Sequence, residues 1–399
     1  SRLDCYAIYL RSAEFFTDKN YGYRRSPVEP DVMDAPPVIG VTMRQNESVV
    51  KHFHSKEGAS IMSKLKLISI DLAKNVFQVC SLNHRQQVKM NKALKRSEIA
   101  EYMAQQPPVL VAMEACYSSH YWARCFEAMG HSVKLIPAQH VTPFVRGNKS
   151  DRNDALAIAE AAQRPNLRSV PVKSLEQQDV QSLHRMRTRY TKTRVALINQ
   201  MRGLLSEYGI IAPQGHSAFC TLLRDICDPD HRALTPLFKT QVNQVGEEYY
   251  QLTNRIKEID TLLTDYAKHN PLCRILMSIP GIGVINATAL YSAIGNGCQF
   301  KNARELAVWL GLTPRQSGSG EKQTSGGITK RGSRYLRSQL VHGARSALIA
   351  SRKKNDVLSL WINRLATRRG FNKACVAMAS RIARIAWVLL HRQESYRTL

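Results

Sequence analysis

The chain has 399 residues and a formal net charge of +26, with 57 Lys and Arg against 31 Asp and Glu. This length allows two or three domains with their own cores, and 44% hydrophobic residues exclude a disordered or collagen-like chain. No run of 18 apolar residues is present, so we expect neither a transmembrane helix nor a membrane partner. The nine cysteines form no C-x-x-C pair and the N-terminus lacks a secretory pattern, so we expect a cytoplasmic protein.

The positive charge is concentrated towards the C-terminus. Residues 300–399 hold 20 basic and 4 acidic residues, whereas residues 1–61 hold eight of each. A solvated surface usually mixes both signs, and this asymmetry favours a polyanionic partner, of which nucleic acid is the commonest. The alternative is a basic protein whose charge serves only solubility.

Residues 1–61 show no sustained hydrophobic period, and a clear strand pattern follows Met62. We therefore expect Met62 to be the natural start and residues 1–61 to be a non-native or disordered N-terminal extension without chemistry of its own.

Residues 62–170 alternate strand and helix patterns. Strands are expected at residues 65–70, 76–82, 86–90, 109–113 and 132–136, and helices at residues 118–129 and 151–163. Three strands followed by alternating helix and strand predict a compact α/β domain.

Residues 171–270 contain two long helix patterns, at 174–208 and 238–268, with an irregular stretch between them. In the second helix, apolar residues alternate spacings of three and four at Val242, Val245, Tyr249, Leu252, Ile256, Ile259, Leu263 and Tyr266. This seam predicts a coiled coil, which could pair with residues 180–208 of the same chain, with a second subunit, or with both.

Residues 271–399 predict a mainly helical domain with two unusual segments. The sequence I-P-G-I-G at 279–283 joins two short helices and is typical of a helix-hairpin-helix turn, in which Gly281 and Gly283 let the backbone approach a phosphate. A simple tight turn would give the same pattern. The second segment is a Ser/Gly-rich loop at 316–327.

Four acidic residues stand where carboxylates can meet. Asp71 and Glu114 end two apolar strands, and Asp151 with Asp154 share one face at the start of a helix. Such a cluster is electrostatically costly without cations, so we expect it to bind two Mg²⁺ ions that could hold a phosphodiester. Each residue alone could instead be structural, as a turn residue or a partner of the helix dipole.

Three short motifs carry these acids: I-S-I-D-L-A-K-N at 68–75, V-A-M-E-A at 111–115 and N-K-S-D-R-N-D-A at 148–155. Together they resemble the DEDD tetrad of a RuvC-like (RNase H-like) fold. More closely, the chain resembles DEDD-type insertion-sequence transposases related to the Piv DNA invertases. The likeness extends to G-L-T-P-R-Q at 311–316, G-G-I-T-K-R-G at 326–332 and L-V-H-G-A-R at 340–345.

The resemblance implies a RuvC-like catalytic domain at 62–170, a helical coiled-coil insert at 171–270 and a C-terminal transposase domain at 271–399. It implies a homo-oligomer, a dimer or tetramer, that cuts and rejoins double-stranded DNA under the guidance of a structured RNA from the mobile element. It also implies a serine nucleophile in the loop after G-L-T-P-R, which meets the tetrad in one composite site.

Ser319 is the favoured nucleophile and Ser317 is the rival, because one shifted gap would exchange them. Flanking glycines would let a DNA backbone come close. Four basic residues could stabilise the charge on the reacting phosphate: Arg315, Lys322, Lys330 and Arg331. His342 is interpreted as structural or phosphate-contacting rather than as a general base.

The remaining basic residues are assigned by the nucleic acid that each is expected to contact. Arg185, Arg187 and Arg189 on the first long helix could hold RNA, whose A-form duplex is recognised by shape and backbone. Arg334, Arg337 and Arg345 are predicted DNA phosphate contacts, although any one of them could simply be a solvated charge.

Two rival functions remain. A Holliday-junction-resolvase-like nuclease would use metal and water and form no covalent intermediate, but it would need neither the serine loop nor the basic second domain. A non-enzymatic nucleic-acid-binding scaffold would not need all four acids, and all four are present.

Overall fold

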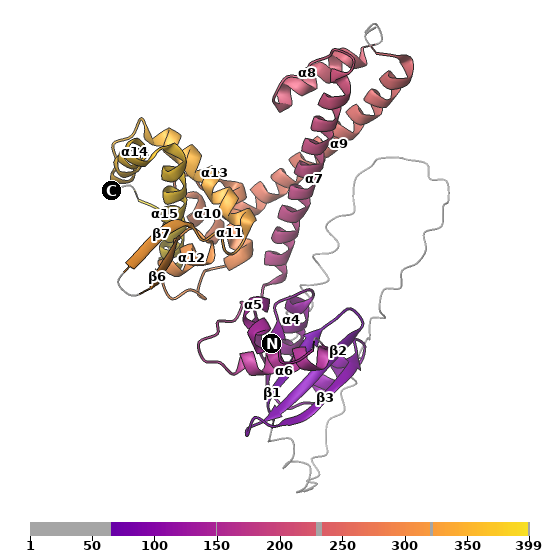
Figure 1. Ribbon diagram of the computed structural model, residues 1–399, viewed down its shortest axis with the longest axis vertical. Helices are drawn as coiled ribbons and strands as arrows, with labels where there is room; N and C mark the ends of the chain where they lie inside the picture. The colour runs from indigo at the N-terminus through magenta and orange to yellow at the C-terminus, as the bar shows by residue number, and fades with distance from the viewer. Residues whose placement is uncertain (1–64, 149, 229–233, 320–321, 398–399) are drawn as a thin grey trace. The chain divides into compact units, whose positions relative to one another are not determined.

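The computed structural model describes residues 65–148, 150–228, 234–319 and 322–397 (Figure 1). The expected extension at 1–61 lies outside these described residues.

The N-terminal part of the described chain is built on a five-stranded sheet of order β3-β2-β1-β4-β5. Its strands are β1 (Leu65–Leu72), β2 (Val76–Asn83), β3 (Val88–Lys95), β4 (Leu110–Glu114) and β5 (Ser132–Ile136). The first three strands form an antiparallel meander, and β1, β4 and β5 run parallel. Ile70 pairs with Met113 across β1 and β4, so both strands deliver their following acidic residue to the same sheet edge.

Helices cover both faces of this sheet, which explains why β1 and β4 are apolar on both sides. The helices are α3 (Ile99–Ala104), α4 (Ser119–Ala128), α5 (Ala138–Val141) and α6 (Asp151–Ala162), with a 3-10 turn at Thr142–Phe144. Trp122 and Phe126 of α4 pack in one core with Ile70, while Ile158 of α6 packs in another core with Leu67. Since side chains alternate along a strand, the face of β1 that carries Leu67 also presents Ser69 and Asp71 to α6.

The long-helix region contains α7 (Leu175–Ser206), α8 (His216–Cys227) and α9 (Pro236–His269). The expectation of irregular structure between the long helices was wrong for α8, whose Phe219, Leu223 and Ile226 are buried in a cluster shared with α7 and α9. Gly209, Pro213 and Gly215 precede this short helix and obscured its period.

The predicted seam of α9 is buried within the chain. Six of its eight residues are buried: Val242, Tyr249, Leu252, Ile256, Ile259 and Leu263. Towards the two ends of the helix, Gly246 and Ala267 are buried beside the partly buried Val245 and Tyr266. The seam packs against apolar residues of α7 and α8, so it has the intramolecular partner that was one of the expected pairings. A true coiled coil and a second subunit on this seam stay predictions.

The C-terminal part is a helical bundle with one β-hairpin. Its elements are α10 (Pro271–Met277), α11 (Val284–Ile294), α12 (Ala303–Trp309), β6 (Pro314–Ser319), β7 (Lys322–Ile328), α13 (Arg334–Ser351), α14 (Val357–Arg369) and α15 (Phe371–Arg392). The segment expected to be a Ser/Gly loop therefore forms a two-stranded hairpin, in which backbone pairing places Ser317 opposite Thr324. The sequence pattern did not predict these strands, because they have no alternation of apolar and polar residues.

Helix α15 is long and apolar enough to cross a membrane by length and composition alone. Its apolar face, including Met378, Ile382 and Leu390, is instead buried in the core of the C-terminal bundle. Core packing therefore accounts for its hydropathy.

Candidate active site

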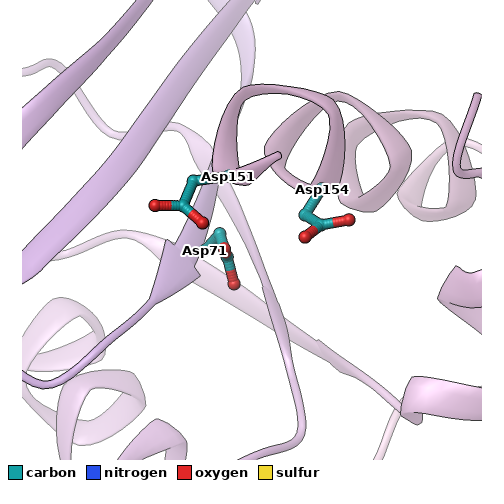
Figure 2. Close-up of side chains that lie close together, drawn as sticks. All are labelled: Asp71, Asp151 and Asp154. Carbon is teal, nitrogen blue, oxygen red and sulfur yellow. The ribbon is translucent and has the colours of Figure 1, made fainter. Parts of the chain in front are cut away.

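Three of the four predicted acidic residues meet at the edge of the sheet. Asp71 lies near the end of β1, and Asp151 with Asp154 lies in the first turn of α6 (Figure 2). One carboxylate oxygen from each of the three lies within 4.8 Å of the other two. The expected convergence of strand end and helix start is confirmed for these three residues.

Two sets of hydrogen bonds fix α6 on the sheet so that this convergence holds. The buried Ser69 hydroxyl donates to the Ala155 carbonyl at 2.7 Å, which ties β1 to α6 one residue beyond Asp154. One residue before Asn153, the Arg152 carbonyl of α6 accepts a hydrogen bond from the side-chain amide of Asn91 in β3 at 3.1 Å. The side-chain oxygen of Asn91 in turn accepts a hydrogen bond from Gln78 at 2.6 Å. The acid-bearing turn is thus held through backbone carbonyls on both sides.

Sequence reasoning missed Ser69, although a signal was present. A polar residue two positions before an acid, inside an otherwise apolar strand, faces the same side as that acid. Ser150 caps α6, because its hydroxyl accepts a hydrogen bond from the Asn153 amide.

Glu114 ends β4 and influences the cluster through its charge. Burial, and after it the charge of Asp154, raises the pKa of Glu114. Burial also raises the pKa of Asp71 to about 6, with further contributions from Asp154, Asp151 and Glu114 in that order. All four acids therefore interact electrostatically, and no cationic side chain of the described residues forms an ion pair with them.

This arrangement can hold a divalent cation. Carboxylate oxygens are the hard ligands that Mg²⁺ prefers, and a cation would relieve the repulsion that disfavours ionisation of Asp71. Cys116 lies beside the same acids. Burial first, and then the charges of Glu114 and Asp71, raise the pKa of its thiol to about 11. Its thiol was not singled out from the sequence.

The serine-bearing hairpin is anchored at its base. Gly332 has φ of 76°, and a Cβ there would lie 2.0 Å from the Trp309 carbonyl oxygen, so the chain after β7 lies directly on the end of α12. Within the hairpin, Ser317 pairs with Thr324 and Ser319 pairs with Lys322. In the described part of the chain, no hydrogen bond or ion pair joins this hairpin to the carboxylates.

The hydroxyl of Ser317 is already engaged. Thr324 donates its hydroxyl proton to the Ser317 carbonyl at 3.1 Å, and the two hydroxyl oxygens lie 2.8 Å apart. The Ser317 hydroxyl therefore serves as the donor to Thr324.

The predicted basic residues divide into engaged and exposed groups. Arg187 forms two hydrogen bonds with Asp260, which raise its pKa, and Arg337 donates to the Leu310 and Arg331 carbonyls. The exposed group comprises Arg185, Arg189, Arg315, Lys330, Arg331, Arg334 and Arg345. The backbone of Lys322 is described, and its side chain lies outside the described set.

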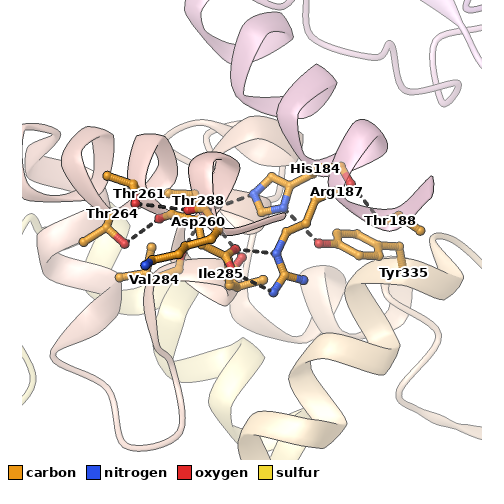
Figure 3. A network of polar contacts seen from close by, with 11 residues as sticks. His184, Arg187, Thr188, Asp260, Thr261, Thr264, Val284, Ile285, Thr288 and Tyr335 are labelled. Atoms are coloured by element: carbon orange, nitrogen blue, oxygen red, sulfur yellow. Dashed lines mark hydrogen bonds and ion pairs between the residues drawn. The ribbon is translucent and has the colours of Figure 1, made fainter. Parts of the chain in front are cut away.

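A buried histidine, missed by sequence reasoning, joins α7 to the C-terminal helices (Figure 3). Thr288 donates its hydroxyl proton to the Val284 carbonyl at 2.7 Å, so its oxygen accepts from Nε2 of His184 at 3.0 Å. Nδ1 of His184 then accepts from the Tyr335 hydroxyl at 2.9 Å. Burial lowers the pKa of His184 to about 4, so one neutral tautomer links three helices.

The glycine-containing turn at 279–283 borders a cavity of about 460 Å³ between α11 and α13. The exposed His342 and the half-buried Gln339 line it from α13, and Gly283 lines it from the turn. The backbone of Gly283 faces open space, because a Cβ built there would meet no atom within 4 Å.

The sheet order, with acids delivered by two parallel strands and an adjoining helix, is consistent with a DEDD nuclease domain. Residues 68–210 match a family of transposases of the DEDD, IS110 type, and residues 273–358 match the family described as Transposase IS116/IS110/IS902.

Whole-chain relatives agree with these two matches. The transposase for insertion sequence element IS1111A of Coxiella burnetii is 42% identical, covering 92% of this chain and 99% of the relative. A probable family 20 transposase of Pseudomonas aeruginosa is 42% identical over 84% of this chain and 99% of its own length. A pilin gene-inverting protein of Moraxella bovis is 23% identical over 82% and 97%.

The chain belongs to the IS110/IS116 family of DEDD transposases of insertion elements. It is an enzyme of DNA cleavage and strand transfer, and the resemblance drawn from its motifs is confirmed.

Proposed function

We propose that this transposase cuts and rejoins DNA at the Asp71, Asp151 and Asp154 cluster, with Glu114 as the fourth acid and two Mg²⁺ ions as cofactors. The observation that carries the proposal is the approach of three carboxylate oxygens within 4.8 Å, without a cationic partner among the described side chains. Bound Mg²⁺ would supply Lewis-acid stabilisation of the phosphodiester oxygens.

The protein groups supply the cation ligands and the nucleophile. Asp71, Asp151 and Asp154 would hold the cations, and the fixed position of α6 keeps the three side chains in place before substrate arrives. Ser319 is the proposed nucleophile. Ser317, whose hydroxyl contacts that of Thr324 within the hairpin, is the rival.

The covalent steps balance as a transesterification. The Ser319 oxygen forms a bond to phosphorus and loses its proton, while the strand's P–O bond breaks and the leaving oxygen takes up a proton as a free hydroxyl. A hydroxyl of the recipient strand then attacks the phosphoserine, which rejoins the DNA and restores Ser319. Arg315, Lys322, Lys330 and Arg331 would neutralise the charge on the reacting phosphate.

Nucleic-acid binding is assigned to the exposed cations and to the open turn. Arg334 and Arg345 would contact DNA phosphates, Arg185 and Arg189 would contact a structured guide RNA, and Gly283 would let a backbone approach α11. The chain would act as a homo-oligomer, with the serine hairpin and the carboxylates meeting in one composite site.

The covalent mechanism is tested by trapping cleavage on a nicked DNA substrate with the element RNA and resolving the products under denaturing conditions. The wild type should give a protein–DNA band, Ser319→Ala should give neither band nor cleavage, and Ser317→Ala should keep both. Asp154→Asn should bind DNA but give no cleavage. If both serine variants cleave normally without an adduct, a water-using, resolvase-like nuclease replaces the serine mechanism.

The two partner proposals have their own measurements. Sequencing of RNA that co-purifies with the protein should recover one structured transcript of the element rather than bulk cellular RNA. Light scattering of the protein with DNA should give the mass of a dimer or tetramer.

A further inference from the structure

A second cavity, of about 440 Å³, lies where α7, α11 and the start of α13 meet. The segment ending at Lys173 and the end of α12 complete its wall. None of the described residues that line it is Asp or Glu, whereas Lys173 and Arg185 both line it. This volume is in the range of ligand pockets.

Among the described residues, the cations of this cavity have no counter-ion. Burial, and after it the charge of Arg185, lowers the pKa of Lys173 to about 8. No carboxylate in the described part of the chain forms an ion pair with Lys173 or Arg185. A half-buried ammonium beside a second cation is costly, and an anionic ligand would offset that cost.

The backbone of Lys173 is fixed, so its position at the cavity is defined. Its amide donates to Nδ1 of His120 at 3.2 Å, and its carbonyl accepts from Arg124 at 2.8 Å. Ser174 immediately after it caps α7 through a reciprocal pair of hydrogen bonds with Gln177.

Two aromatic rings line the same cavity. Trp309 is 40% exposed and packs edge-on against Phe300, with ring centroids 5.7 Å apart. The second ring, Tyr335, is held through its hydroxyl by His184 (Figure 3). A large exposed indole beside uncompensated cations is the combination that single-stranded nucleic-acid sites use, with rings for bases and cations for phosphates.

We propose that this cavity binds one unpaired nucleotide, with its phosphate at Lys173 and Arg185 and its base against Trp309. This proposal rests on the proposed function, and it adds to that function a site that holds a nucleotide of an unpaired nucleic-acid strand. The site adjoins the serine hairpin, because Gly332 lies on the Trp309 carbonyl and Ser333 lines the cavity. The nucleotide belongs to the DNA or to the guide RNA, and both are single strands with the same phosphate and base chemistry.

The test measures tryptophan fluorescence and binding of short single strands, one arm with DNA and one with RNA of the same sequence, in EDTA so that no cleavage occurs. The bound strand should quench the wild-type emission, and Trp309→Phe should lose that quenching with affinity about 10-fold weaker. Lys173→Met and Arg185→Met should each weaken binding and reduce the salt dependence by about one phosphate contact. The arm that shows these effects identifies the strand.

Matched controls separate this site from general charge and from misfolding. Lys257→Met removes the same charge from an exposed position of α9 and should bind within twofold of wild type. Lys173→Arg keeps the charge and should retain binding, and thermal melting checks that each variant is folded. The site is rejected if wild type binds either strand while the Lys173, Arg185 and Trp309 variants bind equally well. That result would leave the proposed cleavage mechanism standing, since the covalent trap tests it separately.

Discussion

The α-carbon of Gly343 lies against the backbone of Gly281, so closely that a Cβ on Gly343 would be 2.0 Å from the Gly281 carbonyl oxygen. The same oxygen accepts a hydrogen bond from Asn286 at 3.2 Å. The turn before α11 and the middle of α13 therefore meet through backbone atoms, which gives Gly281 a packing role beside its predicted contact with nucleic acid.

This contact predicts that Gly343→Ala is severely destabilising. The new methyl group would overlap the backbone of Gly281, which cannot yield without moving the turn or the helix, and would also displace the Asn286 side chain. We therefore expect a loss of about 3 kcal/mol in the free energy of unfolding. Urea denaturation followed by circular dichroism measures it. Unchanged stability would mean that α13 is free to move away from the turn.

Gly283→Ala is the matched comparison in the same turn. Its Cβ would face open space, so we expect at most about 1 kcal/mol of lost stability, from the altered N-cap of α11. If DNA approaches the turn as proposed, this variant should still weaken DNA binding in a filter or anisotropy assay. Wild-type affinity with wild-type stability would remove Gly283 from the DNA interface.

Ser69→Ala tests how α6 is positioned. Loss of the buried hydrogen bond to Ala155 should cost about 1 kcal/mol of stability, because the carbonyl keeps its bond within the helix. The larger effect should fall on the metal site, with Mg²⁺ affinity weakened about 10-fold in a calorimetric titration. Ser351→Ala loses a comparable buried bond to Leu348 in the C-terminal bundle and should leave Mg²⁺ affinity unchanged. Equal effects of both variants on Mg²⁺ binding would contradict a positioning role for Ser69.

Arg187 and Arg189 should behave differently although both were predicted to bind nucleic acid. Arg187→Met breaks the partly buried pair with Asp260 and should cost about 1–2 kcal/mol of stability. Arg189 is exposed and lies over the Tyr190 ring at 4.4 Å, so Arg189→Met should leave stability nearly unchanged and weaken RNA binding. Thermal melting and RNA titration of the two variants, compared side by side, decide the assignment; the reverse pattern would exchange their roles.

The sequence was most informative where burial sets the pattern. The strand at Ser132–Ile136 has the predicted bounds, and the predicted short helix after the 279–283 turn is found at Val284–Ile294, where it is buried on nearly every side. Helix α8 and the β6–β7 hairpin were missed for different reasons. The short helix is surrounded by turn residues, and the hairpin is paired by its backbone with no apolar alternation to reveal it.

For the site, strand ends and helix starts were enough to predict that Asp71, Asp151 and Asp154 converge. The supporting contacts were not predictable, because Ser69, Asn91 and His184 find supporting partners 61 to 151 residues away on the chain for reasons of tertiary packing. For Arg187 the sequence indicated a partner that the fold does not require. Its position on a basic helix predicted a contact with nucleic acid, and only the fold reveals Asp260 beside it.

The last prediction concerns the charge of Asp71 in the absence of metal. Because the folded protein raises the pKa of Asp71 from 3.8 to about 6, it binds this proton more tightly than the unfolded chain does. The contribution of Asp71 to stability is therefore complete below pH 4 and is lost as the pH rises to about 6. Asp71→Asn cannot ionise, so in EDTA at pH 7.5 it should melt a few degrees higher than wild type, and its melting temperature should fall less between pH 4 and 6.

With Mg²⁺ the order should reverse, since wild type gains stability by binding the ion and Asp71→Asn lacks a ligand. In wild type that gain should fade below about pH 6, where protons compete for Asp71. Equal pH slopes in EDTA would show that repulsion among the acids does not govern Asp71, and equal Mg²⁺ stabilisation of both proteins would remove Asp71 from the metal site.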